Sequence, residues 1–84
     1  MMKVRISYLT QARRAAGLAD EEIELPRGTT LAGLLRSLAE RHPEAGLLHP
    51  SLLLFRGDEQ TWPDDPAPLR DAEHVTILAP MAGG

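Results

Sequence analysis

The sequence predicts an α+β fold, in which a mixed sheet of about five strands is covered on one face by one main helix. Segments of alternating polarity lie near both ends of the chain and are typical of half-buried strands. One stretch, residues 31–39, has leucines at helical spacing. The 84 residues, 43% hydrophobic and 25% charged, suit one small globular core. Residues 1–84 are therefore expected to form a single domain.

The first half of the chain predicts a hairpin. Residues 3–9 alternate between apolar and polar side chains, which indicates a strand. Residues 10–19 are rich in alanine and predict a helical turn that ends near Gly17. Residues 20–25 alternate again and predict the second strand, which Pro26 ends. Three acidic side chains of this strand are expected on a solvated face: Glu21, Glu22 and Glu24.

The main helix has clear signals at both ends. Thr29 or Thr30 is suited to cap its first turn. Pro43 disfavours helical geometry at His42, so the helix is expected to end there. The apolar stripe between these ends predicts which side chains face the sheet: Leu31, Leu34, Leu35, Leu38 and Ala39.

Three more strands are predicted after the helix and a loop over residues 43–50: residues 51–55, 59–62 and 74–79. Trp62, at the end of a short edge strand, is expected to be a packing residue. Residues 63–68 contain three prolines and cannot continue a sheet. In the last strand, Val75 and Ile77 are expected to face the helix.

The predicted order is β-β-α-β-β-β, with one good helix. The helix provides a crossover, so a later strand can lie parallel to the first one. This arrangement is that of the β-grasp, or ubiquitin-like, fold.

Composition excludes several classes of function. Nine basic and twelve acidic residues give a net charge of −3, which argues against a nucleic-acid surface. Without cysteine there is no disulfide, thiolate metal site or cysteine nucleophile. No apolar run is long enough to span a bilayer, so no membrane association and a cytoplasmic location are expected.

The side chains offer no enzyme site of the usual kinds. The three histidines lack the close pairing of a metal motif and are expected at the surface, so no metal is expected. They are His42, His49 and His74. No serine has a nucleophile-elbow context, and no glycine-rich loop has phosphate-binding spacing.

The chain ends on "ILAPMAGG", residues 77–84. Pro80 cannot donate a backbone hydrogen bond, so it ends the last strand, and residues 80–84 are expected to project as an extended tail with a reach of about 16–18 Å. Glycines have no side chain to obstruct a narrow channel. The carboxylate of Gly84 therefore suits activation inside another protein's active site. A frayed terminus without function is the alternative that these residues leave open.

Three stretches resemble the MoaD/ThiS family of ubiquitin-like sulfur-carrier proteins, and most closely its MoaD members, small subunits of molybdopterin synthase. "YLTQARRAAGLADEEIELP" is similar to the family's opening hairpin, "TTLAGLLRSLAERHP" to its helix, and "PLRDAEHVTILAPMAGG" to its closing stretch with the terminal Gly-Gly. The chain departs from the family pattern at three places. Arg56-Gly57 replaces Asn-Gly, Ala72 replaces the glycine of a D-G-D-E turn, and Ala79-Pro80 replaces a pair of prolines.

The resemblance implies a mechanism. A MoeB-like adenylating enzyme, related to those that activate ubiquitin, uses ATP and Mg to adenylate the Gly84 carboxylate, which a sulfur donor converts to a thiocarboxylate. The tail then enters a MoaE-like large subunit of molybdopterin synthase, and the sulfur passes to a precursor of the molybdenum cofactor. The chain binds no cofactor itself and is a non-catalytic carrier, the small subunit of a sulfurtransferase complex. The tail positions in the partner's tunnel are Pro80, Met81, Ala82 and Gly83.

The residues also predict a docking surface. Because Val75 and Ile77 face the helix, Leu78 is expected on the open face of the sheet, close to the tail, and Phe55 is a candidate neighbour. Three other functions stay open. They are a sulfur carrier for cysteine, thiamine or tRNA thiolation, a protein modifier joined to lysine through Gly84, and a β-grasp interaction module without terminal chemistry.

Overall fold

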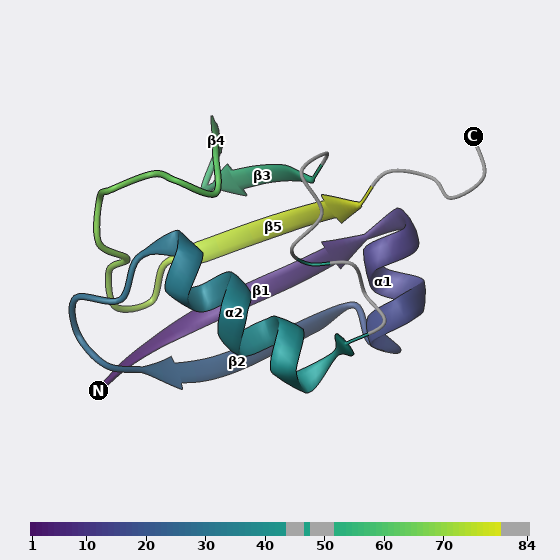
Figure 1. Cartoon of the computed structure of the whole chain (residues 1–84), viewed down its shortest axis with the longest axis horizontal. Coiled ribbons are helices and arrows are strands. Elements are labelled where there is room, and N and C mark those ends of the chain that lie inside the picture. The colour runs from purple at the N-terminus through teal and green to yellow at the C-terminus, as the bar shows by residue number, and fades with distance from the viewer. Residues whose placement is uncertain (44–46, 48–51, 80–84) are drawn as a thin grey trace.

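The computed structural model, which describes residues 1–43, 47 and 52–79, contains a five-stranded mixed sheet and two helices within those residues (Figure 1). In chain order, the elements are β1 (Met2–Leu9), α1 (Thr10–Ala16), β2 (Asp20–Leu25), α2 (Leu31–Arg41), β3 (Leu53–Arg56), β4 (Glu59–Thr61) and β5 (His74–Ala79). The strands lie in the order β2-β1-β5-β3-β4. The predicted β-grasp fold is confirmed.

The strand pairing places β5 at the centre of the sheet. β5 lies parallel to β1, with Ile6 opposite Val75, and antiparallel to β3, with Leu54 opposite Ile77. β2 pairs antiparallel with β1, and β4 pairs antiparallel with β3. A parallel neighbour requires a crossover connection, which here includes α2. The strand that leads into the tail therefore has a hydrogen-bonded neighbour on each side.

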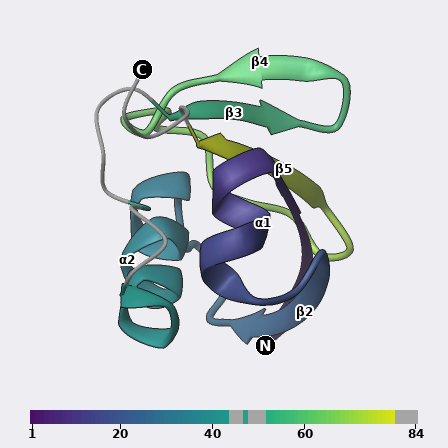
Figure 2. The same cartoon turned by 90° about the vertical axis from the view of Figure 1, so that its right-hand side faces the viewer.

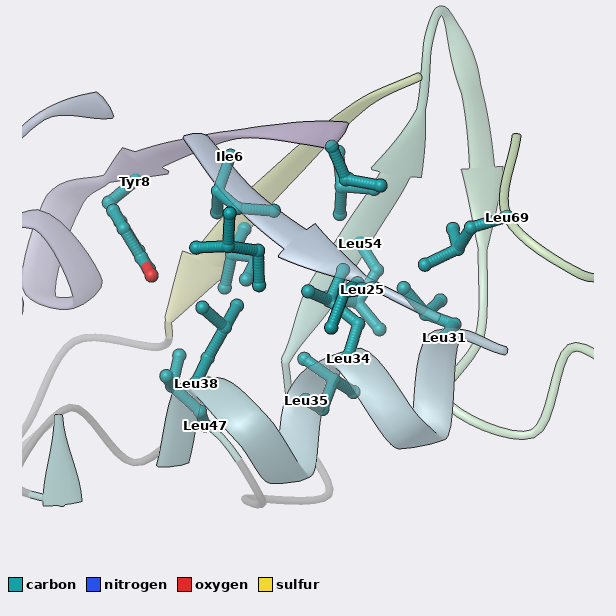
Figure 3. Close-up of a cluster of buried hydrophobic side chains, with 14 of the residues drawn as sticks. Ile6, Tyr8, Leu25, Leu31, Leu34, Leu35, Leu38, Leu47, Leu54 and Leu69 are labelled. Atoms are coloured by element: carbon teal, nitrogen blue, oxygen red, sulfur yellow. The ribbon is translucent and has the colours of Figure 1, made fainter. Parts of the chain in front are cut away.

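The core lies between one face of the sheet and α2. Figure 3 shows leucines of α2 lying toward side chains of the sheet. The side chains without exposed surface in these elements are Val4, Ile6, Tyr8, Leu31, Leu34, Leu38, Leu54, Val75 and Ile77. Because side chains alternate along each strand, the remaining side chains of β1 and β5 point to the opposite face of the sheet. In the described part of the chain, no helix covers that face (Figure 2).

The short helix α1 lies beside the ends of β1 and β5 and packs against both strands (Figure 2). It ends at Gly17, which has a left-handed φ of 80° and donates its backbone N–H to the carbonyl of Arg13. Glycine adopts this conformation without steric cost. The predicted helical turn is therefore confirmed, and its buried Ala12 extends the core.

The ends of α2 confirm one prediction and correct another. His42 is the C-cap, as Pro43 predicted. Thr30 is the N-cap residue, but no side-chain hydrogen bond caps the helix there. Thr29 instead donates its hydroxyl to the carbonyl of Pro26 at 2.7 Å. The two threonines thus lie at the start of α2, but their side chains do not cap the helix.

Trp62 is not a packing residue. It is 61% exposed, whereas the preceding Thr61 is buried. β4 ends at Thr61 and is the edge strand of the sheet. Because successive side chains of an extended segment point to opposite sides, the burial of Thr61 directs Trp62 outward.

Glu21 and His42 are also not the solvated residues that the sequence indicated. The Glu21 side chain is 13% exposed and accepts a hydrogen bond from the Tyr8 hydroxyl at 2.6 Å. His42 lies 2.6 Å from the same carboxylate oxygen, and Arg41 donates to the other oxygen at 2.8 Å. Burial alone raises the pKa of Glu21, but these three partners outweigh it and lower the pKa. Burial and the neighbouring carboxylate raise the pKa of Tyr8. This cluster ties the end of α2 to the first hairpin.

Arg56 organises the proline-rich segment between β4 and β5. Its guanidinium donates to both carboxylate oxygens of Glu73, to the carbonyls of Ala67 and Pro68 at 2.9 and 3.0 Å, and to Asp65 at 3.3 Å. Its side chain is 14% exposed. A planar fork with five donors suits such a set of acceptors. The arginine that departs from the family's Asn-Gly pattern therefore fixes the loop that leads into β5.

Candidate functional site

The predicted reactive tail, Pro80, Met81, Ala82, Gly83 and Gly84, lies outside the described residues. The structure describes the chain up to Ala79, the last residue of β5. The candidate site is therefore built from the surface around that end of β5.

Three leucines lie side by side at this end of the sheet. Leu9 of β1 is opposite Leu78 of β5, and Leu78 is also opposite Leu53 of β3. Leu9 and Leu53 are 42% and 41% exposed, and Leu78 is partly buried. All three alternate with buried neighbours and thus lie on the face away from α2. We name Leu9, Leu78 and Leu53 the leucine row.

Phe55 extends the leucine row along β3. It lies two residues from Leu53, and the intervening Leu54 is buried, so Phe55 lies on the same open face. The structure brings together the two residues that the sequence singled out, Leu78 and Phe55. The sequence did not identify Leu9 and Leu53, because their position beside Leu78 depends on the strand register.

A polar cluster lies further along the same face. The Ser7 hydroxyl donates to Asp20 at 2.9 Å, and Nε2 of His74 lies 2.7 Å from the same hydroxyl oxygen. A hydroxyl has one proton, which here goes to Asp20, so His74 acts as the donor to Ser7. A serine nucleophile needs the opposite arrangement, with its proton directed to the histidine. The three residues therefore form a surface hydrogen-bond network and not a hydrolytic site.

Other kinds of site are not seen in the described ranges. Among residues 1–43, 47 and 52–79, no three His, Cys, Asp or Glu side chains are grouped so as to hold a metal ion. No helix in the same ranges is long and apolar enough to cross a membrane. His49, one of the predicted surface histidines, is not among the described residues, and His74 is exposed as predicted.

Comparison with known proteins gives similarity over almost the entire chain. The model of the ThiS family matches residues 6–84. A molybdopterin synthase sulfur carrier subunit from Chlamydomonas reinhardtii is 26% identical over 83 residues, 99% of this chain and 100% of the relative. A protein of the same name from Caenorhabditis briggsae is 24% identical over 84 residues, 100% of each chain.

The fold is also that of a solved structure. The crystal structure of H. volcanii small archaeal modifier protein 1 superposes with a TM-score of 0.82 at 11% identity, covering 96% of this chain and 100% of that one. This likeness shows a common ubiquitin-like fold.

Proposed function

The chain belongs to the ThiS family, and from this premise we propose that it is a sulfur carrier that serves molybdopterin synthesis as the small subunit of molybdopterin synthase. The observation that carries the proposal is the family match, which extends to Gly84 and so includes the terminal Gly-Gly. Two full-length relatives named molybdopterin synthase sulfur carrier subunit support this pathway.

In the proposed reaction the carboxylate of Gly84 attacks the α-phosphorus of ATP in the activating enzyme, and pyrophosphate leaves. Sulfide from the sulfur donor then attacks the acyl carbon. The bond to AMP breaks, a carbon–sulfur bond forms, and Gly84 carries a thiocarboxylate. Because glycine has no Cβ, the acyl carbon is open to attack from both sides. Mg and ATP belong to the activating enzyme, and the acceptor belongs to the synthase large subunit.

The fold supports this role by where it releases the tail. β5 is held by β1 and β3 and ends beside the leucine row. A partner that takes the tail into its active site therefore also meets an apolar surface. Adjacent exposed apolar side chains are typical of protein interfaces. We propose the leucine row with Phe55 as the docking surface for the activating enzyme and the synthase large subunit.

The proposed function is tested by intact mass. The protein is incubated with an activating enzyme of this family, ATP, Mg and a sulfur donor, and is then analysed by mass spectrometry. The expected product is heavier than the starting chain by the difference between a sulfur and an oxygen atom. Fragmentation is expected to place that difference on Gly84. A product without this mass change contradicts the proposal.

The same spectra separate the alternatives. A product joined to a lysine of another protein, with loss of water, indicates a protein modifier. A thiocarboxylate that a molybdopterin synthase large subunit does not consume indicates a carrier for another thiolation pathway. An unchanged chain with intact partner binding indicates an interaction module.

A charged residue in the leucine row is expected to weaken binding of the carrier to its partners. Leu78→Asp places a carboxylate at the centre of the row. Docking removes water from this carboxylate without giving it a cation or a hydrogen-bond donor in return. We expect the Kd for the activating enzyme to rise about 30-fold, which corresponds to about 2 kcal/mol at an interface hot spot. The measurement is isothermal titration calorimetry.

The more exposed Leu53→Asp is expected to act in the same direction with less effect on folding. Arg36→Gln, on the exposed side of α2, changes the net charge by the same amount and serves as the matched control. Equal affinities for the three variants and the wild type contradict the assignment of this surface.

A further inference from the structure

The net charge of the chain is concentrated at one end of the sheet. Residues 56–74 contain six acidic residues and two arginines, a net charge of −4. The rest of the chain contains six acidic and seven basic residues, a net charge of +1. The net negative charge of the protein therefore lies in the β3–β4 hairpin and the segment that follows it.

The same region surrounds a broad depression of about 890 Å³. Its lining includes Arg56, Glu59, Trp62, Asp64, Arg70 and Asp71, and we name it the Trp62 depression. Glu59 and Asp64 are exposed. The guanidinium of Arg56 is directed to Glu73 and Asp65, which leaves Arg70 as the exposed cation of the lining.

Trp62 is the feature that points to a ligand. It is the only tryptophan of the chain and is 61% exposed. Tryptophan is highly buried on average in folded proteins, and it is enriched among interface residues that carry binding energy. Its ring attracts cations electrostatically, arginine more often than lysine. The exposed tryptophan and the exposed carboxylate of Asp64, two residues further on, thus combine two attractions for one basic side chain.

The Trp62 depression extends from the start of β5 toward the leucine row. Thr61 is opposite Leu54, so Trp62, which follows Thr61, comes next to Leu53. β5 begins here at His74 and releases the chain at its other end, after Ala79. Six residues of strand put about 17–20 Å between these ends. A segment bound over Trp62 therefore lies beside the leucine row, whereas the lining around His74 lies at the other end of β5.

We propose that the Trp62 depression binds a basic, extended segment of a partner protein, with an arginine or lysine side chain over the ring of Trp62. Glu59 and Asp64 face the neighbouring cations of that segment. The charge of this region selects against acidic segments and accelerates the encounter with basic ones. The proposal does not depend on the tail chemistry, so a chain without residues 80–84 is expected to bind equally well.

The single tryptophan makes binding directly measurable. The probe is a capped hexapeptide of alternating glycine and arginine, titrated into the full-length protein while Trp62 emission is recorded. The expected result is a saturable change that weakens about tenfold from low to physiological salt, since exposed charges are screened. A matched glycine–glutamate peptide is expected to leave the emission unchanged.

Variants then locate the site. Glu59→Gln with Asp64→Asn is expected to weaken arginine-peptide binding at least tenfold. The control, Glu24→Gln with Glu40→Gln, removes the same charge from exposed positions of β2 and α2 and is expected to change binding less than twofold. Trp62→Ala is measured by anisotropy of a labelled peptide and is expected to abolish saturable binding. Circular dichroism melts verify folding of each variant.

Three results overturn the proposal. The first is an absence of saturable binding in the wild type. The second is an equal loss in the two charge variants, which indicates attraction by net charge alone. The third is a concentration-dependent emission change without peptide, with a dimer in sedimentation, which assigns the depression to a second copy of this chain.

Discussion

A chain that lacks Gly83 and Gly84 is expected to lose sulfur loading completely while it keeps the melting temperature of the full-length domain. Within residues 1–43, 47 and 52–79, which the structure describes, all strands and buried side chains precede Gly83 and Gly84. Loss of the two residues therefore removes the reacting carboxylate and shortens the tail by about 6–7 Å. The measurements are pyrophosphate release by the activating enzyme and intact mass.

The control keeps the length of the tail. Gly84→Ala retains a terminal carboxylate but adds a methyl group beside the reacting carbon, so slower loading is expected and not a complete loss. If the truncated chain is loaded as fast as the wild type, the chemistry does not take place at Gly84. If the melting temperature of the truncated chain is lower than that of the full-length chain, the terminal residues support the fold.

Among single substitutions of charged residues, Arg56→Met is expected to give the largest loss of stability. Met has a similar length but leaves the carboxylate of Glu73, itself 14% exposed, without its cation. Two carbonyls also lose their donors. We expect the free energy of unfolding to fall by about 2–3 kcal/mol, and the melting temperature by about 10–20 °C. Urea denaturation followed by circular dichroism measures the change.

Two variants test the reason. Arg56→Lys keeps the charge but loses the planar fork, so an intermediate loss is expected. Arg36→Met, an exposed position on α2, is expected to change stability by less than about 0.5 kcal/mol. Equal losses for Arg36→Met and Arg56→Met contradict the role of the network.

The Arg56 effect is also expected to depend on pH. Arg56 is the main cause that lowers the pKa of Glu73, and hydrogen bonds from Thr61 and the Ala67 amide, together with Arg56, lower the pKa of Asp65. The ordinary values are 4.5 and 3.8. A carboxylate with a lowered pKa stabilises the fold fully above its ordinary value, and this stabilisation is lost as the pH falls through the folded-state value. The difference between wild type and Arg56→Met is therefore expected to narrow below about pH 4.

The fold was predictable from sequence because its signals are local. Alternation in β1 and β5 and the leucine spacing of α2 depend on neighbours within one element. The leucine row was only partly predictable. Leu78 follows from the burial of Ile77, but Leu9 and Leu53 become its neighbours only through the register of three strands.

The polar networks were not predictable for a similar reason. The alternation of residues 20–25 places Glu21 on the same side of the strand as Ile23, but it does not show that Tyr8 and His42 contact the Glu21 carboxylate there. Arg56 meets acceptors nine to seventeen residues further along the chain. Ala72 shows the reverse case. Its φ of 65° lies in the left-handed region, which accounts for the glycine that the family pattern has at this place.

The central position of β5 has a mechanical consequence. A partner that grips the chain beyond Ala79 and holds the domain by its open face applies its pull along the axis of β5. That strand is bonded in parallel to β1 and in antiparallel to β3, so the load is shared by two ladders in shear. An edge strand pulled in the same direction has one ladder to carry the load, whereas β5 has two. The domain is therefore expected to stay folded when its C-terminal end is pulled out of a narrow channel in a partner.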